Sequence, residues 1–181
     1  MIRYLSLAFL FAFGCNPKVI HYLNESAPFS GFTTYQITNV KINNADISEA
    51  GQEIIKYIES AIIGEMNRRS YKPQKDPDLI VRYELISNQE TNVNVNNYGY
   101  GGYYSYPYRT VSVRTFLESA LLVEIINLKT KKAIWNASVD LNNYKKEKDM
   151  DEVIQKAVVT IFNTYPYKAG SRYPDQSLII Q

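Results

Sequence analysis

The acidic side chains Asp76, Asp78 and Glu84 are the groups in this sequence that could carry acid–base chemistry. Two carboxyl groups roughly 5 to 9.5 Å apart across a cleft could hydrolyse a glycosidic bond. Asp76 and Asp78 flank a proline at the start of a segment with alternating apolar residues, where aspartate commonly caps its own backbone. We therefore interpret this pair as strand-start chemistry and keep hydrolysis as a lesser alternative.

Other catalytic and metal-binding groupings need residues that the sequence hardly supplies. His21 is the single histidine and Cys15 the single cysteine, too few for a Ser-His-Asp triad or a zinc site. The acids Asp149, Asp151 and Glu152 could suggest calcium, but acids at a helix start also match the helix dipole. We expect a non-catalytic protein with no metal and no cofactor.

A tyrosine-rich segment is the feature most suggestive of binding. It lies within Asn88–Arg109, a region that begins with several asparagines. Tyrosine with glycine and serine is the mixture that binding loops use, and aromatic faces also stack on sugar rings. The alternative is a low-complexity insertion that joins two strands, and Val93 and Val95 alternate with asparagine as in a strand. The candidate binding residues are Tyr98, Tyr100, Tyr103, Tyr104, Tyr106 and Tyr108.

Cys15 follows a short apolar stretch and two small residues in the order Ala12-Phe13-Gly14-Cys15. The apolar stretch is shorter than the roughly 20 residues of a membrane span, so residues 1–14 are predicted to be a signal peptide. A lone thiol in an oxidising compartment would be a liability, whereas lipidation explains both its position and its solitude. We expect several acyl chains, palmitate among them, on Cys15; an ordinary secretory signal is the alternative.

Charge and context restrict the partners. The chain has 20 basic and 18 acidic residues, and removing Arg3 with the signal peptide leaves 19 against 18, a net charge of +1. This near-neutral balance argues against nucleic acid, whose binding needs clustered basic residues. Asn16, rather than aspartate, follows the cysteine, so we expect the periplasmic face of the outer membrane.

The hydrophobic pattern predicts one domain. Residues 15–30 are interpreted as the lipidated cysteine and a tether, residues 31–166 as the folded domain, and residues 167–181 as a tail that could add an edge strand over 178–180. Alternation with a period of two predicts strands, and apolar stripes with helical spacing predict two helices. The strands are expected at 31–37, 79–86, 110–128 (with a possible bulge at Ser119) and 133–141, and the helices from Asp46 or Ser48 to Arg69 and from Asp149 or Asp151 to Pro166. The expected fold is α+β: a two-layer sandwich with a twisted, mainly antiparallel sheet and two amphipathic helices on one face.

Three segments resemble a family of envelope lipoproteins, the domain-of-unknown-function family 4136. They are Asp76-Pro-Asp-Leu-Ile-Val-Arg-Tyr, the hairpin from Glu118 to Ala137 with its Trp135, and the closing Phe162-Asn-Thr-Tyr-Pro. The chain departs from the family at Ser119-Ala120, Glu124 and Asn127. The resemblance supports the fold and the envelope address and transfers no catalytic residue.

Taken together, the sequence predicts a membrane-anchored envelope lipoprotein that binds another envelope component, most simply a protein. A small-ligand or glycan binder that uses the tyrosines is the alternative. An enzyme is the third and least favoured hypothesis.

Overall fold

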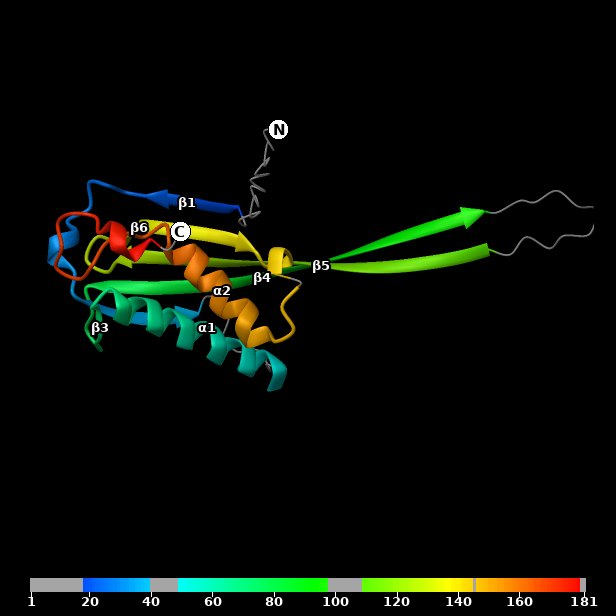
Figure 1. Ribbon diagram of the computed structural model, residues 1–181, viewed down its shortest axis with the longest axis horizontal. Helices are drawn as coiled ribbons and strands as arrows, with labels where there is room; N and C mark the ends of the chain where they lie inside the picture. Colours follow the sequence, from blue (N-terminus) through cyan, green and yellow to red (C-terminus); the bar gives the residue numbers. More distant parts are fainter. Residues whose placement is uncertain (1–17, 40–48, 98–108, 145, 180–181) are drawn as a thin grey trace, which may run out of the picture.

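The computed structural model describes residues 18–39, 49–97, 109–144 and 146–179, with the backbone alone for 87–97 and 109–118. It forms a two-layer α+β fold in which two helices cover one face of a six-stranded sheet (Figure 1). The predicted fold class is therefore confirmed. The strands are β1 Val19–Leu23, β2 Thr34–Asn39, β3 Lys72–Pro73, β4 Leu79–Asn97, β5 Arg109–Asn127 and β6 Lys132–Asp140; the helices are α1 Glu49–Arg68 and α2 Met150–Phe162, with 3₁₀ turns η1 Phe29–Gly31, η2 Leu141–Tyr144 and η3 Gln176–Leu178.

The sheet has the strand order β1-β6-β5-β4-β2-β3. β1 pairs antiparallel with β6, β6 with β5, and β5 with β4. β2 runs parallel to β4 because α1 forms the crossover between them. A bulge in β6 leaves Ile134 without a ladder partner, since Ile125 pairs with Trp135 and Ile126 pairs with Ala133. The extra residue breaks the alternation of β6, so that the consecutive residues Ile134 and Trp135 are both buried.

The core lies between the helices and one face of the sheet. Alternate residues of β4 and β5 are buried there, as the period of two predicts, and Trp135 of β6 is fully buried. The helical stripes face the same layer, so the apolar residues at helical spacing are the ones that pack. Buried helix residues are Ile58, Ala61, Ile62 and Met66 of α1 and Ile154, Ala157, Val158, Ile161 and Phe162 of α2.

Helix α1 ends in a Schellman motif. The Tyr71 N–H donates to the Met66 carbonyl at 3.0 Å, and the Ser70 N–H donates to the Asn67 carbonyl at 2.8 Å. Ser70 adopts the left-handed conformation that this motif requires, with φ of 65°. The reversal turns Tyr71 into the core. The predicted N-cap residues of this helix, Asp46 and Ser48, lie outside the described residues, and Asp149 is confirmed as the N-cap position of α2.

The interpretation of residues 15–30 as a tether is wrong for its described part. Residues Val19–Leu23 form β1, which pairs with β6 along its whole length. Phe29 is buried and stacks on Tyr167, with ring centroids 3.6 Å apart. Edge-strand pairing does not require continuous apolar sequence, so this strand left no clear periodic signal.

The interpretation of residues 167–181 as a tail is also wrong. Tyr167 and Leu178 are buried, and the Gly170 N–H donates to the Phe32 carbonyl at 2.8 Å. In the described part of the edge strand expected at 178–180, Leu178 ends the 3₁₀ turn η3, which the side chain of Asp175 caps, and residue 180 lies outside the described residues. This segment is thus a packed part of the domain.

The described part of the region 88–109 is strand. β4 and β5 stay paired from Leu79↔Asn127 to Asn97↔Arg109, well beyond the last residues that β2 and β6 cover. Beyond Ser87↔Ser119 they form a two-stranded ribbon that projects from the body (Figure 1). We refer to residues 87–97 and 109–119 as the ribbon. The strand alternative for Val93 and Val95 is therefore confirmed, and the segment between the strands narrows to residues 98–108.

The packed C-terminal segment yields a matched pair of variants. Leu178→Ala should lower the free energy of unfolding by about 2 kcal/mol because its side chain is buried. Ile179→Ala should change it by less than about 0.5 kcal/mol, since that neighbour is 36% exposed. Urea denaturation followed by circular dichroism measures both, and equal effects would contradict the packing described here.

Candidate functional site

The residues that the sequence predicts for lipidation and for binding lie outside the described residues. These are Cys15 and the tyrosines Tyr98, Tyr100, Tyr103, Tyr104, Tyr106 and Tyr108. Their lipidation and binding roles stay predictions. The structure does describe the chain on either side of them: β1 begins at the fourth residue after Cys15, and the ribbon ends at Asn97 and Arg109.

The ribbon gives the tyrosine-rich segment its attachment points. Its register sets valine against valine, at Val93↔Val113 and at Val95↔Val111, and β-branched residues favour extended backbone. Eleven residues from Ser87 to Asn97 at 3.3 Å each carry the chain about 35 Å from the body. A two-stranded hairpin is marginal in water by itself, so this extension depends on the sheet at its root. The ribbon therefore holds both ends of segment 98–108 away from the body.

Asp78 joins the start of β4 to the chain at the start of β2. Its carboxylate accepts hydrogen bonds from the backbone N–H groups of Thr33 and Thr34, at 2.8 and 3.0 Å. Both threonine hydroxyls donate to the same oxygen. Partial burial acts to raise the pKa of Asp78, but these four hydrogen bonds outweigh it and hold the pKa below its ordinary value. Asp76 is exposed. Asp78 thus lies at the start of β4 as expected, but its carboxylate binds the distant Thr33 and Thr34 instead of capping its own backbone.

The lowered pKa of Asp78 predicts a pH dependence of stability. Its carboxylate contributes stability above the unfolded pKa of about 4, and that contribution is lost as the pH falls through the folded pKa. Asp78→Asn should cost about 1.5 kcal/mol at pH 7 because charge-assisted hydrogen bonds are lost, and the difference from wild type should shrink below pH 4. Asp76→Asn is the control. A deficit for Asp78→Asn that stays constant down to pH 2 would contradict this account.

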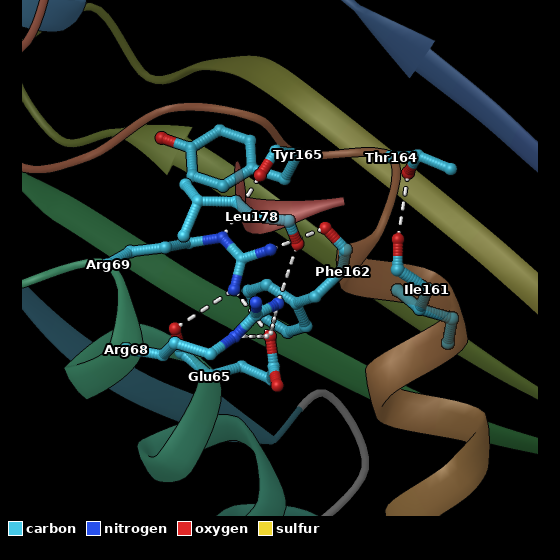
Figure 2. Close-up of polar contacts among 8 residues, drawn as sticks. All are labelled: Glu65, Arg68, Arg69, Ile161, Phe162, Thr164, Tyr165 and Leu178. Carbon is cyan, nitrogen blue, oxygen red and sulfur yellow. Dashed lines mark hydrogen bonds and ion pairs between the residues drawn. The ribbon is translucent and has the colours of Figure 1, made fainter. Parts of the chain in front are cut away.

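A buried charged cluster joins the ends of the two helices (Figure 2). The Arg69 guanidinium is fully buried, and its Nε donates to the Tyr165 carbonyl at 3.0 Å. One terminal nitrogen donates to the Phe162 carbonyl at 2.6 Å, and the other donates to both the backbone carbonyl and the carboxylate of Glu65. Arg68 binds the same carboxylate and donates to the Leu178 carbonyl. We call Glu65, Arg68 and Arg69 the arginine cluster.

Two tyrosines lie beside the arginine cluster. The Tyr71 and Tyr165 hydroxyls share a hydrogen bond of 2.9 Å. Burial raises the pKa of Tyr71 to about 12 and raises that of Tyr165 well above its ordinary value, so both hydroxyls stay protonated. Burial also lowers the pKa of Arg69, while the Glu65 carboxylate opposes that shift. Each guanidinium nitrogen of the buried Arg69 donates to at least one acceptor, so this residue links the elements around it.

The arginine cluster makes a testable contribution to stability. Arg69→Met should lower the free energy of unfolding by about 3–5 kcal/mol, because the buried Glu65 carboxylate loses a charged partner and the Tyr165 carbonyl loses its Arg69 donor. Arg172→Met, at an exposed arginine, is the matched control and should stay within about 0.5 kcal/mol of wild type. Chemical denaturation decides between them. A mild effect of Arg69→Met would show that the cluster is replaceable by packing alone.

A groove of about 490 Å³ lies between α1 and the outer edge of β2. β3 pairs only with Thr34 and Tyr35 on that edge, and no other described strand continues along it. The carboxylate of Glu59 lines the groove and accepts a hydrogen bond of 2.9 Å from the Tyr83 hydroxyl. The groove is thus a hollow beside a sheet edge, and its lining contains one carboxylate and no pair of catalytic groups. Its lining residues are Tyr35, Gln36, Ile37, Glu59, Ile63, Pro73, Gln74 and Lys75.

The described residues contain neither a metal-binding cluster nor a membrane-spanning helix. No group of three or more His, Cys, Asp or Glu side chains there could hold a metal ion. None of the described helices has the length and apolar character needed to cross a bilayer.

Comparison with known families settles the relationship suggested by the strand, hairpin and closing-helix segments. The family model "Domain of unknown function (DUF4136)" matches residues 19–167. The chain belongs to this family. The match begins at the first residue of β1 and ends at Tyr167, so the family domain includes the N-terminal strand and the buried aromatic pair. No curated protein matches the sequence.

Solved structures share the fold at low sequence identity. A PDZ domain protein from Parabacteroides distasonis aligns with a TM-score of 0.54 and 14% identity, covering 88% of this chain and 37% of that one. This chain thus corresponds to little more than a third of that protein. A PelC dodecamer from Paraburkholderia phytofirmans aligns with a TM-score of 0.45 and 10% identity, covering 92% of this chain and 99% of that one. The first likeness concerns the fold alone, and the second is too distant to support an argument.

Sequence reasoning missed the burial of Arg69. An arginine at the end of a predicted helix matches the negative end of the helix dipole, which gives no reason to expect burial. The signal was nevertheless present, because Ile58, Ile62, Glu65 and Arg69 follow one another at helical spacing along the apolar stripe. Two oppositely charged residues on the buried face of a helix indicate an internal ion pair.

Proposed function

We propose that the protein is a non-catalytic, lipid-anchored envelope protein that presents its tyrosine-rich segment to another envelope component, most simply a protein. The observation that carries this proposal is the ribbon, which joins the body to both ends of segment 98–108. A packed domain with a long arm and a binding-type composition at its end suits recognition.

The structural roles of the polar groups support the non-catalytic part of the proposal. The carboxylate of Asp78 accepts hydrogen bonds from Thr33 and Thr34, and Arg69 of the arginine cluster donates to the carbonyls around the end of α2. Acyl chains on Cys15 would supply the anchor, and several chains together bind a bilayer effectively permanently. The periplasmic face of the outer membrane is the proposed location.

The experiment compares wild type with a variant whose residues 98–108 are replaced by Asn-Gly. This two-residue turn suits a hairpin and preserves the Asn97↔Arg109 pair, so the ribbon keeps its register. In-cell crosslinking and mass spectrometry should capture a partner with wild type and not with the turn variant. Replacing the six tyrosines of the segment by serine tests the rings alone, with Tyr173→Ser, at an exposed tyrosine elsewhere, as control.

The remaining outcomes separate the alternatives. A partner that both proteins capture would contradict presentation by the segment. Tyrosine fluorescence that responds to cell-wall fragments in wild type only would indicate that the partner is a glycan and not a protein. Cys15→Ser should move the protein from the membrane fraction to the soluble fraction, and an unchanged distribution would contradict lipid anchoring.

A further inference from the structure

The chain enters the fold at the same end of the sheet from which the ribbon departs. Val19 pairs with Val139, which pairs with Leu121, and Leu121 pairs with Leu85 at the root of the ribbon. β1 runs antiparallel to β6 and β6 antiparallel to β5, so β1 runs parallel to β5. The residues before Val19 therefore leave the sheet toward the ribbon side.

A lipid on Cys15 would hold this end of the sheet close to a bilayer. The four residues from Cys15 to Val19 span at most about 14 Å when extended. The ribbon extends about 35 Å in the same direction, so a domain standing on this end would drive the ribbon into the hydrocarbon layer. A two-stranded ribbon has open edges, and backbone groups without partners are not tolerated there. The sheet must therefore lie along the surface.

The exposed side chains of β1 decide which face lies toward the lipid. Ile20 is 68% exposed and Tyr22 is 52% exposed. Their strand neighbours Val19, His21 and Leu23 pair with the buried, helix-covered side of β6, so Ile20 and Tyr22 belong to the opposite face. No described helix covers that face (Figure 1).

The rest of this face near β1 fits a lipid surface. Ile20 is level with Ser138, and Tyr22 is level with Asn136, so the residues of β6 directly beside them are uncharged. The exposed Asp140 lies at the end of β6 on the same face. Further along the row, Arg82 and Glu124 pair with each other. Tyrosine prefers the headgroup region, where its ring is in apolar surroundings and its hydroxyl stays hydrated. An anchor already in the bilayer makes even a weak contact effective, because the contact becomes intramolecular.

We propose that the helix-free face of the sheet, through Ile20 and Tyr22, lies on the membrane that holds the lipid anchor, so that the ribbon runs along the bilayer surface. The partner is a lipid surface. This inference rests on the proposed lipidation of Cys15 and adds the orientation of the domain.

The test uses full-length lipidated protein in vesicles of phosphatidylethanolamine and phosphatidylglycerol. Cys15 is the single cysteine, and the proposed thioether lipid blocks its sulfur, so an introduced cysteine would be the one free thiol. A nitroxide is attached at Ser138→Cys on the helix-free face or at Lys56→Cys, an exposed position of α1 on the helix side. Collision with a water-soluble nickel complex and with lipid-soluble oxygen then reports which face meets the bilayer.

The expected result is a several-fold loss of nickel accessibility at position 138, with a gain in oxygen accessibility, and no change at position 56. The double variant Ile20→Ser, Tyr22→Ser should restore nickel accessibility at 138 while the protein still sediments with the vesicles, and Tyr173→Ser should not. Circular dichroism confirms that each variant is folded. Protein that sediments with vesicles but shows equal nickel accessibility at both positions would overturn the orientation. Protein that does not sediment would overturn the anchor itself, and the orientation with it.

Discussion

The guanidinium of Arg69 is the constraint on which the helix layer depends. It donates to the carbonyls of Phe162 and Tyr165 and to Glu65, and it lies 5.1 Å from the centre of the Phe162 ring. A buried cation is costly unless acceptors surround it, so the end of α1, the end of α2 and the chain beyond it must meet at one place. The Schellman motif at Ser70 and Tyr71 turns the chain at that same place. Arg69 thus sets how the two helices sit over the sheet.

Concentrating the helices and the C-terminal segment on one side makes the molecule asymmetric. The helix side holds the buried aromatic residues around Tyr165, including Trp135 at a centroid distance of 5.3 Å. The other side of the sheet has no described helix over it, and the ribbon has no described neighbour beyond its own two strands. Stability is therefore expected to be highest around Arg69 and lowest along the ribbon, since a two-stranded ribbon is marginal without further strands beside it.

How much the sequence predicts depends on whether a signal is local. The stripes of α1 and α2 and the alternation of β4 and β6 predicted the elements and the fold class, because each pattern repeats within one segment. The pairing of β1 with β6 joins residues more than 100 positions apart, and no pattern within Val19–Leu23 predicts that pairing. The burial of Tyr167 depends likewise on Phe29, a distant partner. For the candidate site, the sequence predicted the tyrosines, whereas the projection of the ribbon follows from strand register.

The construction of the ribbon has a consequence for how the chain tolerates insertions and deletions. Each residue of one ribbon strand is matched by one residue of the other, from Ser87↔Ser119 to Asn97↔Arg109. Removing two residues from each strand shortens the arm by about 7 Å and leaves every remaining residue on its original face. Removing one from each strand exchanges the faces of everything beyond the cut. Arm length in this architecture is therefore a variable that can change in paired steps without touching the core, whereas the sequence around Arg69 has no such freedom.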